Sequence, residues 1–574
     1  MKLENAMSVY ERYRAVEYSL PKTYLSWDLF GAGLENLGRD GKAVELPLRP
    51  PRADEVLLRV DALGLCFSDT KLIWAGPDHP RIRGRDLKND PTVAGHEAAL
   101  TVVGVGSDWK NKFDIGQRFI IQADIKIGGE QKAFGYVQRG AMAQYAYAGP
   151  WVLDGEGTCY LLPMKDATGY VEAALVEPWA CVEGAYRIAE RVKPQPGGRF
   201  LTVFASGAKA DFSGLFEKEP ALMHVLGGPD ADIAGIGHGA TRKGEATPEA
   251  VKAAAAEAGG YTDIFLIGVP DAALTEACDA ALAVSGVLCF VSDAAIPGKA
   301  AMDIGRAHYE LTRHNGTAGA RIMDAYGRNT RTDLVPGGRT WMVGAAGPMG
   351  QMHVQRALEL ATPPKILFCT DLSDERLAYM TTRLKPLAEK KGVDFICLNV
   401  GGVKDMGECI AALTGGKDFD DIYVHAPVAP LVEQAADYLA AQSILNVFAG
   451  VGIGTMARFS PEIFRTLHTR LIGSSGSSME DIVNTLNKME AGQLATRMSL
   501  AAIGGIEATW LGIKGVKENR FPGKTVIFPQ LHGLDLAGMD GFAGICPEAA
   551  ALLEPGNVWT NAAEKVFLEK MLKV

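Results

Sequence analysis

The sequence predicts an α/β protein in which a β-rich N-terminal region precedes two consecutive doubly wound parallel sheets. Residues 44–165 contain short β-branched or aromatic runs broken by Gly, Pro and Asp. From residue 199 onward, continuous apolar strands alternate with amphipathic helices, which is typical of a parallel sheet covered on both faces. Gly accounts for 66 of the 574 residues while Pro accounts for only 29, which indicates many tight strand-to-helix turns rather than linkers.

The β-rich region resembles a small, partly open barrel. It ends in an Ala-rich stretch with helical spacing at residues 170–190, before the Pro- and Gly-containing segment at 194–198. We therefore expect a first domain at residues 1–190, completed by residues 470–574 at the end of the chain.

The middle of the chain contains an internal repeat. The strand that begins at Tyr261 matches the strand that begins at Phe419, and the segment after His308 matches the segment after His468. The offset is about 160 residues, which is the size of a whole domain rather than of a solenoid unit. We therefore expect tandem domains at residues 191–330 and 331–469.

The second copy contains a glycine-rich loop between a strand and a helix. It follows the G-x-G-x-x-G pattern of dinucleotide-binding domains, with Ala345 in the first position and an additional Gly344 before it. Asp371 ends the next strand, 21 residues after Gly350, where a carboxylate is expected to bind a ribose hydroxyl. This acid favours NAD over NADP, and the nearby Arg376 weakens the preference. The candidate cofactor-binding residues are Gly344, Ala345, Gly347, Pro348, Met349, Gly350, Asp371 and Arg376.

The first copy lacks this loop. Its strand at residues 201–205 is followed by Gly207 and Gly214 without the G-x-x-G spacing, and Asp211 stands where phosphate would lie. The expected first helix is replaced by an irregular segment. We predict a degenerate Rossmann-like domain that binds no dinucleotide in the usual way.

A second group of residues carries candidate chemistry in the N-terminal region. Cys66, Ser68 and Asp69 follow a strand, His96 and Glu97 follow a glycine, and Glu177 lies in the helical stretch that ends the region. A thiolate, an imidazole and carboxylates suit a borderline metal such as Zn²⁺. Spacing this wide is not diagnostic alone, because a His after Gly is often structural.

These motifs in this order resemble the zinc-dependent medium-chain dehydrogenase/reductase superfamily, in its polyol dehydrogenase and L-sorbose 1-phosphate reductase branch. The resemblance covers about residues 45–200 and 336–574. It implies a GroES-like β-barrel catalytic domain followed by Rossmann domains. It also implies that Cys66, His96, Glu97 and Glu177 are metal ligands, with one of the two glutamates binding directly. Ser68 would contact the substrate oxygen and start a proton relay, and Asp69 would orient His96.

Two departures from the family pattern stand out. Residues 100–158 contain no Cys, so a structural zinc site with four cysteines is absent and one catalytic zinc is expected. The additional domain at 191–330 has no standard role.

Between Cys66 and His96, a loop with Arg81, Arg83 and Arg85 could hold a phosphate or carboxylate, or be a solvated loop with local ion pairs.

Composition excludes several classes of function. The formal charge is −10 without a basic run, which argues against nucleic-acid binding. The N-terminus resembles no secretory signal, and no apolar stretch is long enough for a membrane span. Nine dispersed Cys without a C-x-x-C pair favour a reducing compartment, so we expect a cytoplasmic protein.

The sequence thus predicts an oxidoreductase that transfers hydride between NAD and a secondary alcohol or ketone of a polyol, sugar or sugar phosphate. The alternatives are a threonine-dehydrogenase-like activity on an amino alcohol, and a non-catalytic sensor of nucleotide or redox state with an assembly role. We also expect the degenerate domain to pair with the NAD domain inside the chain, as an imitation of the family's dimer contact. The other arrangement is that it packs elsewhere, as in a new homo-oligomer interface.

Overall fold

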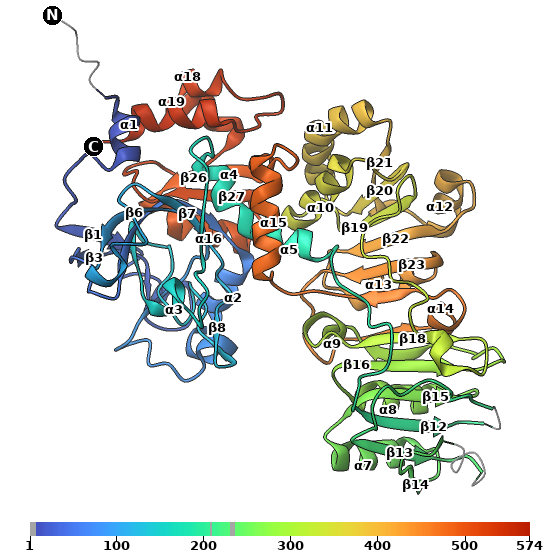
Figure 1. Cartoon of the computed structure of the whole chain (residues 1–574). Coiled ribbons are helices and arrows are strands. Elements are labelled where there is room, and N and C mark those ends of the chain that lie inside the picture. Colours follow the sequence, from blue (N-terminus) through green and yellow to red (C-terminus); the bar gives the residue numbers. More distant parts are fainter. Residues whose placement is uncertain (1–6, 207–208, 230–235, 574) are drawn as a thin grey trace, which may run out of the picture. The chain divides into compact units, whose positions relative to one another are not determined.

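The computed structural model describes residues 7–206, 209–229 and 236–573 (Figure 1). The chain forms two compact units. Unit 1 comprises Met1–Glu183 and Gly476–Val574, and unit 2 comprises Gly184–Ser475. The boundaries expected from the sequence, near residues 190 and 470, lie within a few residues of these divisions. In the part of the chain that the structure describes, no helix is both long and apolar enough to cross a membrane.

Unit 1 is built on an eight-stranded sheet, in the order β11-β7-β6-β4-β27-β26-β28, with β10 also pairing with β4. Its central strand β4 (Val56–Leu65) is buried along its whole length. On one side β4 pairs antiparallel with β6 (Glu97–Val105), and on the other with β27 (Lys524–Phe528). The sheet therefore joins the two chain segments of unit 1. The remaining strands are β7 (Arg118–Ile121), β10 (Tyr145–Ala148), β11 (Leu161–Pro163), β26 (Leu500–Gly505) and β28 (Ala537–Gly538).

Two helices of unit 1 carry predicted site residues. Helix α2 (Phe67–Ala75) starts directly after β4, and α5 (Val176–Gly184) contains Glu177. Just before α5, the short helix α4 (Tyr170–Ala174) is capped by the C-terminal helix α19 (Asn561–Met571). Glu564 of α19 accepts hydrogen bonds from the backbone N–H groups of Tyr170 and Val171. This cap satisfies helix-terminal donors that would otherwise be buried without a partner.

Unit 2 contains two six-stranded parallel sheets with the same topology. The first has the order β14-β13-β12-β15-β16-β18, and the second has the order β21-β20-β19-β22-β23-β25. This is the doubly wound dinucleotide-binding order. The first sheet consists of β12 (Arg199–Phe204), β13 (Leu222–Leu226), β14 (Thr241–Gly244), β15 (Tyr261–Ile267), β16 (Leu282–Val291) and β18 (Arg313–Thr317). The second consists of β19 (Arg339–Val343), β20 (Ile366–Asp371), β21 (Asp394–Asn399), β22 (Phe419–Val424), β23 (Leu439–Val447) and β25 (Arg470–Ile472).

The two sheets repeat each other in backbone detail. Ser285 and Gln442 stand at equivalent places in β16 and β23, and both have positive φ, 59° and 56°. Leu311 and His468 precede β18 and β25, and they too have positive φ, 57° and 51°. Non-glycine residues seldom adopt this conformation, so its recurrence at matching positions is strong evidence of a repeat. The predicted fold class, with a β-barrel-like catalytic unit and two Rossmann-like sheets, is confirmed.

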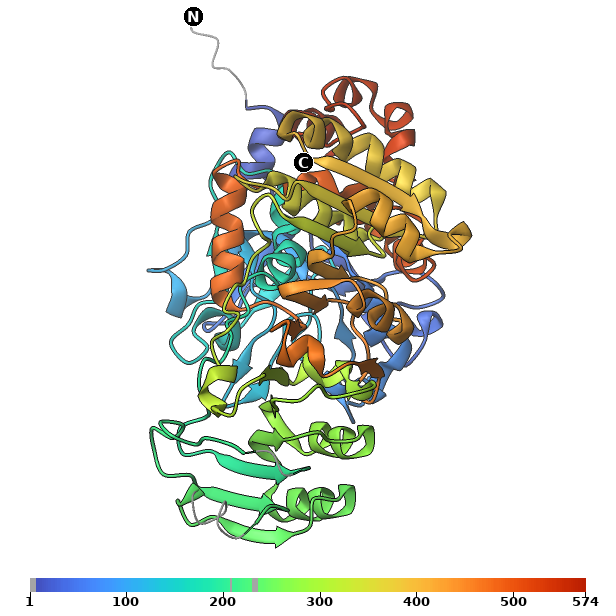
Figure 2. The same ribbon diagram turned by 90° about the vertical axis from the view of Figure 1, so that its right-hand side faces the viewer.

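The first repeat departs from the second on one sheet face. Helices α7 (Pro248–Ala258) and α8 (Ala272–Ala280) pack on one face, where Figure 2 shows them in green. Residues 209–221 contain no helix, and the other face is covered by irregular segments with Phe212 and Leu215. The expected loss of the first helix is thus observed, and Gly207 lies outside the described residues.

A short antiparallel ladder links the two repeats. β17 (Ala300–Asp303) pairs with β24 (Met456–Phe459), and each strand follows the fifth strand of its own sheet. Ala300 faces Phe459, and Asp303 faces Met456. The first residue of each strand thus pairs with the last residue of its counterpart, which is the pattern of a contact with two-fold symmetry. One continuous apolar core, which includes Met302 and Phe464, spans both repeats.

Candidate metal and dinucleotide sites

The candidate metal site begins at the turn between β4 and α2. Cys66 is the residue before α2, and the Asp69 carboxylate accepts a hydrogen bond from the Cys66 backbone N–H at 2.9 Å. The other Asp69 oxygen accepts hydrogen bonds from the Gly95 N–H and from His96 Nδ1, both at 3.1 Å. A single buried carboxylate therefore orients both candidate ligands. With Nδ1 as the donor, the Nε2 atom of His96 is left as the acceptor.

Gly95 and Gly64 make room for the site. Gly95 has φ of +93°, and a Cβ atom there would lie 2.9 Å from the Met142 backbone nitrogen. Gly64 of β4 is the register partner of Glu97 on β6, and a Cβ atom there would lie 2.2 Å from Glu97 Oε2. Only glycine fits at these two positions without a shift of the neighbouring atoms.

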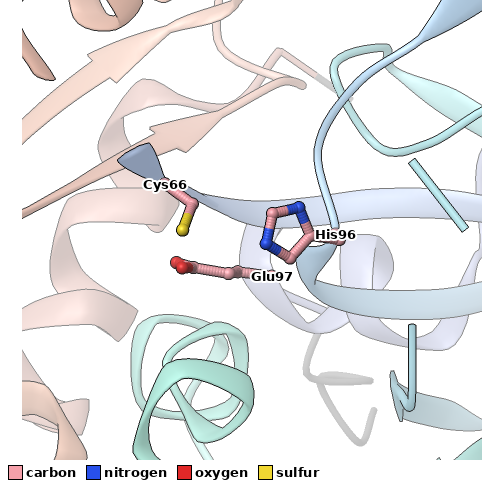
Figure 3. A group of neighbouring side chains, drawn as sticks. All are labelled: Cys66, His96 and Glu97. Atoms are coloured by element: carbon pink, nitrogen blue, oxygen red, sulfur yellow. The ribbon is translucent and has the colours of Figure 1, made fainter. Parts of the chain in front are cut away.

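Three candidate ligands converge in the structure. One ligand atom each from Cys66, His96 and Glu97 lies within 4.8 Å of the others (Figure 3). Ser68 Oγ donates to Cys66 Sγ at 3.0 Å and lies 3.2 Å from His96 Nε2. The predicted proton-relay hydroxyl is therefore in contact with two of the candidate ligands.

The donor set fits a zinc ion. Glu97 Oε2 is buried and has no hydrogen-bond partner among the described residues, which is costly unless a cation occupies the site. A thiol sulfur, an imidazole nitrogen and a carboxylate oxygen are the ligand types of catalytic zinc.

Glu177 stands apart from this group. It is buried in α5 and is not among the three residues whose ligand atoms converge. Burial raises the pKa of Glu177 to about 7; His96 opposes this shift, and Glu97 and Asp124 add to it. The carboxylate therefore lies within electrostatic range of the candidate ligands.

Sequence reasoning missed Lys524, which is buried at the start of β27. Its Nζ donates to Glu97 Oε1 at 2.6 Å. Burial lowers the pKa of Lys524, but Glu97 and Cys66 outweigh that effect and raise it. No motif marks this lysine in the sequence, because it lies 427 residues after its partner.

A group of four side chains adjoins the candidate ligands, and we call it the polar wall: His79, Arg81, Asp124 and Tyr136. The Tyr136 and His96 rings lie 5.7 Å apart, and His79 stacks on Tyr136 at 5.5 Å. The Arg81 guanidinium lies 4.5 Å from the centre of the Tyr136 ring, and it forms a 2.6 Å ion pair with Asp124. Asp124 and Tyr136 have no sequence motif that could have identified them.

The three arginines of the basic loop do not form one cluster, because they have different surroundings. Arg85 donates to the backbone carbonyl of Val137 at 2.7 Å and pairs with Asp90, so it holds the loop in place. Arg83 is exposed. Arg81, in contrast, lies over the Tyr136 ring and pairs with Asp124.

The candidate dinucleotide loop lies in unit 2, between β19 and α10 (Pro348–Glu359). Gly344 has φ of +69°, and Gly347 is the residue before the helix, with open space where a Cβ atom would lie. A Cβ atom on Gly350 would lie 2.6 Å from the Ala345 carbonyl oxygen, so this glycine lets helix and strand pack closely. Ala345 is buried, and Pro348 and Met349 form the first turn of the helix.

Asp371 ends β20 beside this loop. Its Oδ2 atom accepts a hydrogen bond from the Ala346 N–H at 3.0 Å, and its Oδ1 atom accepts from the Leu372 and Ser373 N–H groups. Arg376 lies in the first turn of α11 (Asp374–Lys391), where its N–H donates to Ser373 Oγ. The sequence-predicted carboxylate thus contacts the glycine-rich loop itself.

The fold is that of an alcohol dehydrogenase-like oxidoreductase, and the three converging side chains offer ligand types that suit zinc. The family model for the alcohol dehydrogenase GroES-like domain matches residues 52–153. The chain is 23% identical to mannitol-1-phosphate 5-dehydrogenase of Aliivibrio fischeri, over 90% of this chain and 92% of that protein. It is 22% identical to L-sorbose 1-phosphate reductase of Klebsiella pneumoniae, over 92% of this chain and 95% of that protein.

A solved structure gives the same fold. The putative alcohol dehydrogenase of Sinorhizobium meliloti superimposes with a TM-score of 0.50 and 14% identity, over 89% of this chain and 100% of that chain. The resemblance to the zinc-dependent medium-chain dehydrogenase/reductase superfamily, in its polyol dehydrogenase and sorbose-phosphate reductase branch, is confirmed. These similarities support an NAD-linked polyol or sugar dehydrogenase activity with zinc and NAD(P) as cofactors.

Proposed function

We propose that the chain is a zinc-dependent dehydrogenase that transfers hydride between NAD and a secondary alcohol or ketone of a polyol, sugar or sugar phosphate. The observation that carries this proposal is the convergence of Cys66, His96 and Glu97, with the Ser68 hydroxyl beside His96 Nε2. The same convergence speaks against a sensor without catalysis, because a sensor has no need of a metal-ligand set with a serine hydroxyl beside it.

The mechanism follows from the roles of the chain's own groups. Cys66, His96 and Glu97 would hold the zinc, and Glu177 is the remaining candidate ligand; when bound, the ion supplies a Lewis acid that favours loss of hydride from the alcohol carbon. Ser68 would hydrogen-bond the substrate hydroxyl and relay its proton: the serine oxygen would accept that proton while its own proton passes on to solvent. Asp69 holds His96 in the tautomer that leaves Nε2 free to bind.

The cofactor is proposed to bind in the second repeat of unit 2. The N–H groups at the start of α10 suit a pyrophosphate, and the Asp371 carboxylate suits a ribose 2′-hydroxyl. A negative charge at Asp371 repels the 2′-phosphate of NADP, which supports NAD as the preferred cofactor. Arg376, in the adjacent helix turn, would reduce this preference.

The ion pair of Arg81 and Asp124 is proposed to bind the distal part of the substrate. A carboxylate accepts hydrogen bonds from hydroxyl groups, and a guanidinium donates to hydroxyls or to a phosphate. The names of the relatives that match nine tenths of the chain include both polyol phosphates and sugar phosphates. This supports a phosphorylated polyhydroxy substrate at the polar wall.

The first repeat is proposed to replace a partner subunit. Support comes from the ladder between β17 and β24, whose register has two-fold symmetry, and from the core shared by both repeats. β18 and β25, the edge strands of the two sheets, also lie side by side. A tandem copy has a far higher effective concentration than a separate subunit, so this contact would need no dimer.

We also propose a cytoplasmic location, which the nine dispersed cysteines favour.

A substrate panel tests the proposed function. Purified, zinc-loaded protein is incubated with NAD or NADP and with hexitols, their 1-phosphates or threonine, and nicotinamide absorbance is followed. We expect turnover with NAD and a polyol or its phosphate. Turnover with threonine alone would favour the amino-alcohol alternative, and bound zinc and NAD without turnover of any substrate would favour the sensor.

A further inference from the structure

Two cysteines face each other across neighbouring strands of the second repeat. Cys369 lies in β20 and Cys397 in β21, and the two residues are register partners in a parallel pair. Register partners point to the same side of a sheet, and neighbouring strands lie about 4.8 Å apart. Disulfide-linked residues have Cα atoms roughly 4.4–6.8 Å apart, so the spacing of neighbouring strands places this pair within the range from which a disulfide can form.

The two thiols differ in their access to solvent. Cys369 is fully buried, whereas Cys397 is partly exposed. Cys397 lines a surface groove of about 530 Å³ between α11 and β21, together with Thr381, Lys385 and Asn399. A small oxidant can therefore reach Cys397 from the groove, and Cys369 lies beside it on the neighbouring strand.

The hydrogen bonds of the pair assign a different role to each sulfur. The Cys369 thiol donates to the Cys397 sulfur and lowers the pKa of Cys397; burial opposes this shift, and the Thr381 hydroxyl adds to it. Burial raises the pKa of Cys369. The more accessible sulfur is thus the better nucleophile, as in pairs that consist of a reactive and a resolving cysteine.

We propose that Cys397 and Cys369 form a peroxide-reactive pair that weakens NAD binding when it is oxidised. The Cys397 thiolate attacks hydrogen peroxide, the O–O bond breaks, and the products are a sulfenic acid and hydroxide. The Cys369 thiol then attacks the sulfenic sulfur, and a disulfide forms as water leaves. Each sulfur gives up one electron, the peroxide accepts both, and an external dithiol reverses the reaction.

The expected weakening of NAD binding follows from the position of the two cysteines in the sheet. Cys369 and Cys397 lie two residues before Asp371 and Asn399, which are themselves register partners at the ends of β20 and β21. A disulfide draws the two sulfurs to about 2.05 Å, and the strand ends move with them. Asp371 would then lose its alignment with the Ala346 N–H in the glycine-rich loop. This regulatory step rests on the proposed function, whereas the chemistry of the pair does not.

Peptide mapping of the full, zinc-loaded chain tests the chemistry. Trypsin separates the two cysteines into peptides 366–376 and 392–404, and it places Cys409 in a third peptide, 405–417. After peroxide treatment, we expect the first two peptides to be joined and two hydrogens lighter, and dithiothreitol should separate them. Cys397→Ser should abolish the joined species, while the matched control Cys409→Ser, at another partly exposed thiol, should retain it.

Calorimetric titration with NAD tests the regulation. We expect the Kd of the oxidised wild-type chain to be at least threefold higher than that of the reduced chain, and peroxide to leave the Kd of Cys397→Ser unchanged. Absence of the joined peptide, or a joined peptide with an unchanged Kd, would overturn the proposal. If the reduced chain does not bind NAD at all, the proposed function fails instead, and the joined peptide can still be measured.

Discussion

Lys524 Nζ lies 2.6 Å from Glu97 Oε1, and both side chains are buried. The other Glu97 oxygen lies against Gly64 without a hydrogen-bond partner among the described residues. The lysine therefore provides a charged hydrogen-bond partner for Glu97 Oε1 and leaves Glu97 Oε2 for a cation. A residue of the C-terminal segment thus sets the charge balance of a site whose three converging ligands lie in the first hundred residues.

This ion pair predicts a specific stability pattern for the metal-free protein. Lys524→Met should lower the free energy of unfolding by about 3 kcal/mol, because it leaves the Glu97 carboxylate buried and unpaired. Lys524→Arg keeps the charge and should cost less. Adding Glu97→Gln to Lys524→Met should recover much of the loss, as measured by denaturant unfolding. Equal effects of the Met and Arg variants would show that packing, rather than charge, dominates.

One zinc per chain is the second prediction. Elemental analysis of the purified protein should find about one zinc per chain. Among the described residues, one group of side chains converges in a way that could hold a metal ion, and it consists of Cys66, His96 and Glu97. Cys66→Ala should lose the zinc and the turnover but keep the circular dichroism spectrum. Cys159→Ala, at an exposed cysteine, is the control and should change neither. Two tightly held zinc ions per chain would contradict the assignment.

Cofactor preference should depend on Asp371. The wild-type chain should use NAD with a higher kcat/KM than NADP, and Asp371→Asn should reduce that ratio roughly tenfold by removing the repulsion of the 2′-phosphate. Asp374→Asn, at a neighbouring exposed acid at the start of α11, should leave the ratio unchanged. Better use of NADP by the wild-type chain would refute the assignment of Asp371.

Arg81 should distinguish phosphorylated from neutral substrates. Arg81→Met should raise KM for a hexitol phosphate about tenfold or more, since a charged hydrogen bond is worth roughly 1.5–3 kcal/mol. KM for the neutral hexitol should change little. Arg83→Met, at an exposed arginine of the same loop, is the matched control and should affect neither substrate. An equal rise in KM for both substrates would show that Arg81 maintains the structure of the polar wall and does not bind the phosphate.

The number of NAD sites tests the degenerate repeat. Titration should saturate at one NAD per chain, because the glycine-rich loop and Asp371 occur in the second repeat and residues 209–221 of the first contain no helix to face a pyrophosphate. Ala345→Asp and Gly347→Asp should abolish that single site. Two equivalent sites would disprove the degeneracy of the first repeat.

Local patterns were sufficient to predict much of the fold and the candidate site. The alternation of strands and helices identified both parallel sheets. The Cys66–Asp69 and Gly95–Glu97 motifs placed the residues that converge, because each is a short local segment at a strand terminus, the first directly after β4 and the second at the start of β6. The glycine-rich loop was recognisable for the same reason, since its geometry depends on adjacent residues.

Long-range partners could not be predicted in this way. The contact between Lys524 and Glu97 depends on β27 pairing with β4, and no local pattern encodes that pairing. The three loop arginines appeared equivalent in sequence, yet Arg85 binds backbone carbonyls while Arg81 pairs with Asp124. Such differences arise from backbone direction in the folded loop, which composition does not reveal.

The split of unit 1 into two chain segments has a consequence for synthesis. The ribosome makes Glu97 first and Lys524 427 residues later, a delay of roughly 20–85 s at 5–20 residues per second. All of unit 2 is translated in that interval as one uninterrupted segment, so it can fold while the sheet of unit 1 still lacks β26 and β27. We therefore expect the candidate metal site to be completed late, after unit 2 has been synthesised and once Lys524 can reach Glu97.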